Sequence, residues 1–136
     1  MKENKPRALL IGSSFSAMPV LIFLKKQGYH VSVCGGLKSD PCHIYAHQSF
    51  YVDYSNRDDL LDLLKSNNFD FIIPTCNDYS YNAASFVSTS LNQFHGFDTD
   101  SVTTTLHSKN DFKSFLIKNK KPTAKILKNI TKDDLR

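Results

Sequence analysis

Short apolar runs alternate with longer stretches of helical pattern over most of the chain. The strand-like runs, rich in β-branched and aromatic residues, lie at 8–11, 31–33, 50–52 and 71–73. Strands that alternate with helices favour a parallel sheet, because a parallel connection needs a long crossover. The pattern therefore predicts an α/β domain of three layers with a mostly parallel sheet.

Local signals mark the ends of the predicted helices. Pro19 suits the first turn of a helix that Gly28 ends. A short helical turn is expected at 44–47, and Ser55 with Asp58 forms a capping box for the next long helix. These signals place a helix between each pair of predicted strands.

The second half of the sequence predicts further helices. Asn77 or Asp78 can cap a helix that follows the fourth strand, and a weak fifth strand is expected at 93–97. Beyond it, Asp98 can cap a short helix and Ser108 can cap another. The chain is thus expected to continue mainly as helix.

The C-terminal residues carry the start of a further element. Thr131 with Asp134 forms one more capping box, and 123–127 has the pattern of a strand without an evident partner. We interpret the chain as the N-terminal piece of a longer protein, with 1–118 as the α/β domain and 119–136 as a linker and the beginning of a truncated second domain. A frayed natural tail is the alternative.

Composition excludes several classes of protein. Lys and Arg number 17 against 13 Asp and Glu, and the surplus is too dispersed to predict a nucleic-acid-binding surface. No apolar run approaches the roughly 18 residues of a membrane span, and no export signal is recognised. Cys34, Cys42 and Cys76 lack C-x-x-C spacing, so neither a disulfide framework nor a zinc site is indicated, and we expect Cys34 and Cys76 to be buried, inert thiols. A cytoplasmic protein without nucleic-acid or membrane partners is expected.

A binding site is predicted from topology. In an open parallel sheet, ligands bind beyond the carboxyl ends of the strands, near the point where the winding direction reverses. Polar loops follow the first, second and fourth predicted strands, so we predict substrate-binding residues there: Gly12, Ser13, Ser14, Phe15, Ser16, Gly35, Gly36, Asn77 and Asp78. Local alternatives stay open, because the serines could satisfy the turn backbone and Asn77 or Asp78 could simply cap a helix.

The familiar cofactor and catalytic motifs are incomplete. The turn at 12–17 keeps only the first glycine of a G-x-G-x-x-G fingerprint, and no acid follows the second strand to hold ribose hydroxyls, although Lys38 leaves a phosphate-bearing dinucleotide open. His43 and His47 stand four residues apart without a glutamate, which disfavours a metal site. No G-x-S-x-G elbow occurs. We therefore predict no catalytic residue and no metal ligand in this chain.

The order and spacing of six sequence pieces carry a resemblance to a known family. The pieces lie at 8–12, 28–31, 41–53, 69–74, 108–113 and 120–123. Over about residues 7–127 the chain resembles the N-terminal preATP-grasp domain of ATP-grasp ligases. That superfamily includes biotin carboxylase, carbamoyl phosphate synthetase and the formate-dependent glycinamide ribonucleotide transformylase. The resemblance implies a Rossmann-like fold.

The resemblance also implies a division of labour. This domain would supply one wall of the cleft and part of the site for a small carboxylate or amine substrate. A C-terminal ATP-grasp domain, missing here, would hold ATP and Mg²⁺, and the reaction would be attack of an amine or another nucleophile on an acylphosphate. Lys109 matches the family's nucleotide-contacting lysine, whereas the family's glutamate after the fourth strand is replaced by Asn77 and Asp78. The substrate is therefore left open.

Two functional hypotheses follow. The first is a fragment of an ATP-grasp carboxylate–amine ligase or carboxylase-like enzyme, inactive by itself and compatible with a homodimer. Its ATP and Mg²⁺ would be bound only in the full-length enzyme. The second is a non-catalytic Rossmann-like module that binds a ligand or a nucleotide.

Overall fold

The computed structural model describes residues 5–124. The chain forms two compact units, Met1–Thr103 and Thr104–Arg136. The strands are β1 (Arg7–Ile11), β2 (His30–Cys34), β3 (Gln48–Phe50) and β4 (Phe71–Pro74). A 3-10 turn η1 (Phe15–Ala17) precedes the helices, which are α1 (Met18–Lys26), α2 (Pro41–Tyr45), α3 (Arg57–Ser66), α4 (Asp78–Leu91), α5 (Asp100–His107) and α6 (Lys109–Lys118).

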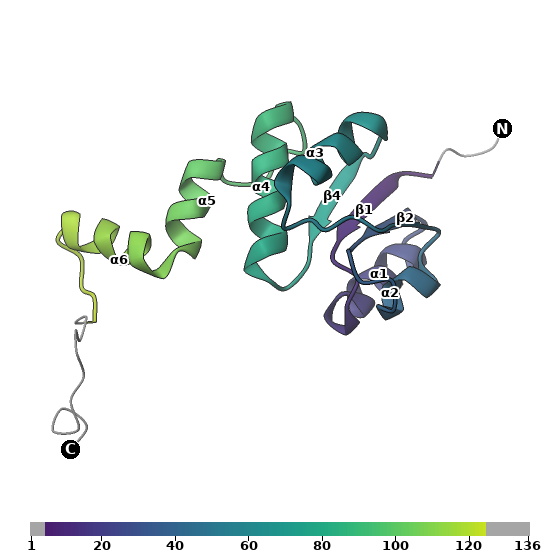
Figure 1. Cartoon of the computed structure of the whole chain (residues 1–136), viewed down its shortest axis with the longest axis horizontal. Helices are drawn as coiled ribbons and strands as arrows, with labels where there is room; N and C mark the ends of the chain where they lie inside the picture. Colours follow the sequence, from purple (N-terminus) through teal and green to yellow (C-terminus); the bar gives the residue numbers. More distant parts are fainter. Residues whose placement is uncertain (1–4, 125–136) are drawn as a thin grey trace, which may run out of the picture. The chain divides into compact units, whose positions relative to one another are not determined.

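The first unit is built on one parallel sheet with the strand order β3-β2-β1-β4. Figure 1 shows β1 between β2 and β4. The winding starts at β1, runs outward to β3, and then returns to place β4 on the other side of β1. The last residue of β1, Ile11, is in register with Cys34 of β2 and with Pro74 of β4. Cys34 in turn is in register with Phe50 of β3. All four strands therefore end at the same edge of the sheet.

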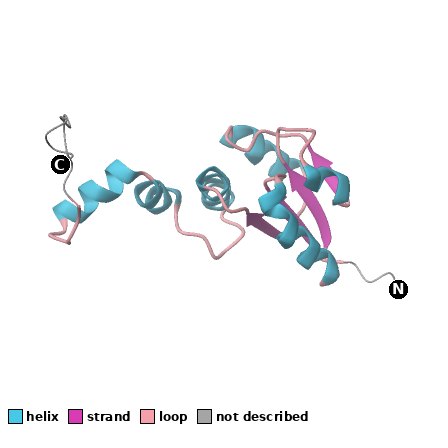
Figure 2. Ribbon diagram, turned by 90° about the horizontal axis from the view of Figure 1, so that it is seen from below, coloured by secondary structure: helices cyan, strands magenta, loops and turns pink. Residues whose placement is uncertain are grey.

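Helices cover both faces of this sheet, which makes the three layers (Figure 2). Leu9 and Ile11 of β1 belong to a buried cluster with α3 and α4. Ala8 and Leu10 point to the other face and pack with α1 and α2. Successive strand side chains alternate between faces, and β1 is apolar on both, as a central parallel strand must be. The predicted α/β, Rossmann-like architecture is confirmed.

The third strand lies two residues earlier than expected. β3 runs over Gln48–Phe50 and pairs with β2 alone, while Tyr51 is exposed. The preceding α2 begins at Pro41 rather than at 44, with proline in the first helical turn. Because β3 is an edge strand, its position is set by pairing with β2 and not by the most apolar run.

The capping box expected at Ser55 and Asp58 is wrong. The N-cap of α3 is Asn56, without a side-chain cap. Ser55 instead donates through its main-chain N and its Oγ to Oδ1 of Asp53, at 2.9 and 2.7 Å. This Asx-type turn competes for the serine hydroxyl, and such local bonds are the usual rivals of helix caps.

The segment after α4 is a loop and not the expected fifth strand. Phe94 and Phe97 pack on the core that faces α3 and α4, and the Ser88 hydroxyl donates to the carbonyls of Gln93 and Phe94. These side-chain bonds satisfy backbone groups that a strand would have paired with a neighbour. The apolar pattern at 93–97 therefore reflects burial of two aromatic rings.

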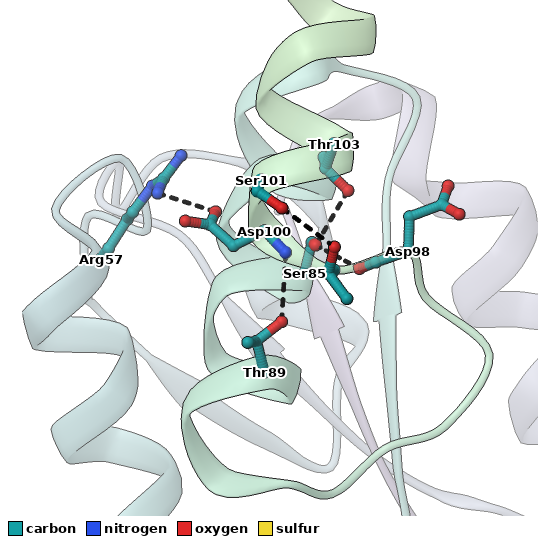
Figure 3. Close-up of polar contacts among 8 residues, drawn as sticks. Arg57, Ser85, Thr89, Asp98, Asp100, Ser101 and Thr103 are labelled. Carbon is teal, nitrogen blue, oxygen red and sulfur yellow. Dashed lines mark hydrogen bonds and ion pairs between the residues drawn. The ribbon is translucent and has the colours of Figure 1, made fainter.

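Polar contacts fix the beginning of α5 against α4 (Figure 3). The Ser85 hydroxyl donates to the carbonyl of Asp98 at 2.6 Å and accepts from the buried hydroxyl of Thr103 at 2.9 Å. Arg57 of α3 pairs with the Asp100 carboxylate at 2.9 Å. The helix thus begins at Asp100, two residues after the aspartate expected to cap it.

Two other helix caps agree with the sequence. Asn77 Oδ1 accepts from the main-chain N of Ser80 at 2.8 Å, and Ser108 accepts from the main-chain N of Asp111 at 3.3 Å. Residues 123–124 are not in a strand, and the remainder of the strand expected at 123–127 and the capping box at 131–134 lie outside the described residues.

The second unit contributes α6, in which every described side chain is at least partly exposed. Its apolar residues include Phe112, Phe115 and Ile117. Within residues 5–124, no helix is long and apolar enough to cross a membrane.

Candidate functional site

A groove of about 580 Å³ lies at the edge where the four strands end, over the loops that follow them. Each of these loops contributes to the groove or to its floor. The lining residues are Ser13, Gly36, Leu37, Asp40, Asp53, Tyr54, Ser55 and Tyr79. The groove is therefore made of two carboxylates, hydroxyl groups, aromatic rings and a glycine backbone.

The floor of the groove depends on two glycines that allow loops to touch. Gly12 has a φ of 125°, and a Cβ there would overlap Oγ1 of Thr75 and lie 2.8 Å from its Cγ2. A Cβ at Gly35 would overlap the Ser13 hydroxyl and lie 2.7 Å from its Cβ. The β1 loop thus packs directly against the loops that follow β4 and β2. Only glycine permits this close packing at residues 12 and 35.

Ser13 connects the β1 loop to the beginning of α2. Its side chain is 4% exposed, and its Oγ donates to Oδ2 of Asp40 at 2.5 Å. Its carbonyl accepts from the main-chain N of Cys42 at 3.0 Å. These two bonds hold the Asp40 carboxylate at the groove through one of its oxygens.

Asp53 provides the second carboxylate from the loop after β3. The hydrogen bonds from the Ser55 hydroxyl and main-chain N to its Oδ1 hold the pKa of Asp53 below its ordinary value. The slight burial of this carboxyl opposes that shift and is the smaller effect. Asp53 is therefore ionised at neutral pH.

The nine predicted substrate-binding residues take different places in the structure. Ser13 and Gly36 line the groove, and Gly12 and Gly35 form its floor. Ser14, Phe15 and Ser16 are exposed beside it: the hydroxyls of Ser14 and Ser16 lie 2.9 Å apart, and Phe15 is 80% exposed. None of these three is in the lining.

Asn77 and Asp78 lie in the loop and first turn of α4. Besides capping α4, Asn77 donates through Nδ2 to Thr75 Oγ1 at 3.1 Å and to the Tyr54 hydroxyl at 3.4 Å. Asp78 is the first residue of that helix, and it is the next residue, Tyr79, that lines the groove. Asn77 thus contacts the lining residue Tyr54 and is not itself part of the lining. Its binding role, like that of Asp78, stays a prediction.

Sequence reasoning missed six lining residues, including both acids. Asp53 follows the third strand, whose loop was not considered, although Asp-x-Ser after a strand is a recognisable Asx-turn signal. Asp40 stands before Pro41 at the N-cap position of α2 without capping it, a place that an N-cap pattern would have assigned to the helix. The others are Leu37, Tyr54, Ser55 and Tyr79.

Two of the three cysteines, Cys34 and Cys42, are buried and are poor candidates for a nucleophile. Burial, with a smaller contribution from Asp53, raises the pKa of Cys34 to about 12. Burial, with a smaller contribution from Asp40, raises the pKa of Cys42 to about 11. Cys34 is the expected buried thiol, whereas Cys76 is exposed, because it lies in the loop after β4 and not in the strand.

Lys109, the predicted nucleotide contact, is the first residue of α6 in the second unit, and its side chain is exposed. Among residues 5–124, no group of three or more His, Cys, Asp or Glu side chains could hold a metal ion.

Comparison with known proteins gives a partial likeness in sequence and an extensive one in fold. No family model matches the chain. The formate-dependent phosphoribosylglycinamide formyltransferase of a Nitratiruptor species is 27% identical over 74 residues, which are 54% of this chain and 19% of that protein.

Two solved structures superpose on most of the chain. The phosphoribosylglycinamide synthetase of Anaerococcus prevotii does so with a TM-score of 0.75 and 19% identity, over 86% of this chain and 30% of its own. The N5-carboxyaminoimidazole synthetase of Staphylococcus aureus, complexed with ADP, does so with a TM-score of 0.63 and 18% identity, over 87% and 31%. The chain therefore spans less than a third of the length of these proteins.

Proposed function

Because the chain has the fold of the N-terminal part of ATP-grasp ligases, we propose that it is the substrate-side domain of a carboxylate–amine ligase or carboxylase-like enzyme of that superfamily. The observation that carries the proposal is the groove at the carboxyl edge of the sheet, where the loops after all four parallel strands meet. In the proposed enzyme the groove holds and orients a small substrate. The domain that binds ATP forms the acylphosphate next to this groove.

The groove is not suited to the nucleotide itself. Its lining contains two aspartates and no lysine, arginine or histidine, whereas phosphate groups are bound by cations and by convergent main-chain N–H groups. The described residues also offer no metal-holding cluster for the Mg²⁺ that would accompany ATP. ATP and Mg²⁺ are therefore assigned to a separate ATP-grasp domain, and no catalytic step is placed on residues of this chain.

Lys109 is the one residue of this chain that we assign to the nucleotide. Its ammonium group is exposed at the beginning of α6, immediately after the Ser108 cap. A lysine in the first turn of a helix is mildly unfavourable to the helix dipole, so its position is better explained by a ligand than by support of the helix. It would supply a point charge to phosphate oxygens.

A titration followed by backbone amide NMR separates this function from that of a nucleotide-binding module. The chain would be titrated with phosphoribosylglycinamide and, separately, with Mg·ATP. We expect phosphoribosylglycinamide to shift the amides of Gly36 and Ser55 saturably, and Mg·ATP to leave them in place. Saturable occupation of the groove by Mg·ATP would contradict the proposal and establish the chain as a nucleotide-binding module.

The same preparation provides an activity check. Since residues 5–124 hold no metal cluster and the groove at the carboxyl edge of the sheet has no cation in its lining, phosphate release from Mg·ATP should equal the buffer blank. Magnesium-dependent hydrolysis that a single substitution in this chain abolishes would show that the division of labour is wrong.

A further inference from the structure

The charge of the groove is uncompensated. Asp40 and Asp53 are the charged residues of its lining, and aspartate carboxylates are negative at neutral pH. The nearest candidate cation in sequence, Lys38, is placed over the ring of Tyr51, with its Nζ 5.4 Å from the ring centroid. Neither of these residues is part of the lining. A ligand that enters the groove therefore meets two negative charges and no cationic side chain in the lining.

Each carboxylate is anchored through one oxygen only. Oδ2 of Asp40 accepts from Ser13, and Oδ1 of Asp53 accepts from Ser55. In the part of the chain that the structure describes, no hydrogen bond reaches Oδ1 of Asp40 or Oδ2 of Asp53. Ionised carboxylate oxygens can only accept hydrogen bonds. Both acids thus keep a fixed acceptor for a donor group on the ligand.

The anchors make these acceptors rigid. Ser13 is buried, and its carbonyl accepts a hydrogen bond from the main-chain N of Cys42. Its side chain packs so closely against Gly35 that a Cβ at residue 35 would overlap the Ser13 hydroxyl. The Asp53 carboxylate is held by two donors from the same residue. Charged acceptors that are fixed before the ligand arrives lose little freedom on binding, which favours affinity.

We infer that the groove takes a primary ammonium group of the substrate and disfavours a phosphate group in the same place. An ammonium group carries a compensating positive charge, and its N–H donors can bind the free oxygen of Asp40 or that of Asp53. A phosphate dianion would be repelled by both carboxylates and find no cation in the lining. The inference rests on the proposed substrate role of the groove and specifies which end of an amine substrate enters it.

Three small probes of one carbon skeleton test this selection: ethanolamine, ethylene glycol and 2-hydroxyethyl phosphate. They place an ammonium, a hydroxyl and a phosphate group on the same two-carbon chain. Each is titrated into the 136-residue chain at fixed pH and ionic strength, with the amides of Gly36 and Ser55 as reporters. Ethanolamine should bind most tightly, and its affinity should fall as salt is added, because salt screens the attraction between the ammonium group and the carboxylates. The phosphate should bind most weakly.

Charge-neutral variants identify the groups responsible. Asp40→Asn and Asp53→Asn each keep one side-chain oxygen as the acceptor for the anchoring serine, so they remove mainly the charge. Each substitution should raise the Kd of ethanolamine about fivefold, because it removes the Coulomb attraction between two unit charges about 4 Å apart in water. Asp58→Asn is the matched control, because Asp58 is an exposed residue of α3 outside the lining, and it should leave the affinity unchanged.

Three results would overturn the inference: tighter binding of 2-hydroxyethyl phosphate than of ethanolamine in the groove, unshifted groove amides with ethanolamine, or equal ethanolamine affinity in Asp53→Asn, Asp40→Asn and Asp58→Asn. None of them bears on whether Mg·ATP occupies the groove, so the substrate-side function would stand or fall separately.

Discussion

Among the glycines of the chain, Gly35 is the one at which an added Cβ would come nearest to a neighbouring atom, and replacing it by alanine tests this packing. The added Cβ would overlap the Ser13 hydroxyl and lie 2.7 Å from the Ser13 Cβ, so Ser13 must move. That movement breaks its 2.5 Å bond to Asp40. An extra methyl group in a packed site costs about 1–3 kcal/mol, and a hydrogen bond to a charged group contributes about 1.5–3 kcal/mol, near the lower limit for this partly buried pair. We expect Gly35→Ala to lower the free energy of unfolding by about 3 kcal/mol.

Urea unfolding followed by circular dichroism measures this loss, with the neighbouring Gly36→Ala as the control. A Cβ at Gly36 would lie 3.5 Å from its nearest neighbour, Cβ of Asp53, which is an ordinary contact, so this variant should change stability by less than about 0.5 kcal/mol. Ser13→Gly removes the obstructing side chain, so in the double variant Gly35→Ala should cause almost no further loss in the free energy of unfolding. The reasoning fails if Gly35→Ala costs no more than Gly36→Ala, or if the costs of Gly35→Ala and Ser13→Gly simply add.

Other perturbations test contacts away from the groove floor. Arg57→Ala should lower the free energy of unfolding by about 1 kcal/mol, because its ion pair with Asp100 is roughly one-third exposed and partly screened. Urea unfolding measures this change, and a loss no larger than that caused by replacing an unpaired surface lysine with alanine would refute the expectation. Partial burial, and then neighbouring positive groups, lower the pKa of His47 in the folded state, so its stabilising contribution is present above the unfolded value of about 6.5 and is lost as the pH falls below it. His47→Ala should flatten the stability profile between about pH 7 and 5, and an unchanged slope would contradict the assignment. A thiol reagent should modify the exposed Cys76 in the native chain and leave Cys34, whose pKa is raised to about 12, unmodified until unfolding; rapid modification of Cys34 in a Cys76→Ser variant would show that β2 is not buried as described.

The sheet could be predicted where burial determines the sequence. β1 carries apolar residues on both faces because helices cover both, and this two-sided pattern was visible at 8–11. β3 could not be placed in the same way, since pairing with β2 at an exposed edge places Gln48 in the strand and leaves Tyr51 outside it. Where tertiary pairing decides, apolar runs are a weak guide.

The position of the site followed from topology, but its chemistry did not. Parallel strands end at one edge, so Ser13 and Gly36 could be placed there from their order in the chain. Asp40 and Asp53 were overlooked because their groove position depends on bonds to serines that sequence patterns assign to turns and caps. A local pattern cannot show which of several neighbouring donors an oxygen will take.

The pairing of β1 with β4 has a kinetic consequence. The bond between the main-chain N of Arg7 and the Asp70 carboxylate joins residues 63 positions apart, whereas β1 and β2 pair Arg7 with His30, 23 positions away. Closing the longer loop costs about 0.9 kcal/mol more chain entropy, and non-local pairing slows folding. The β1–β2 half can therefore form before β4 arrives. Because Thr75 reaches Gly12 only after β4 has docked, the floor of the groove would be completed last, and appearance of ligand binding in a refolding experiment would time the final step of folding.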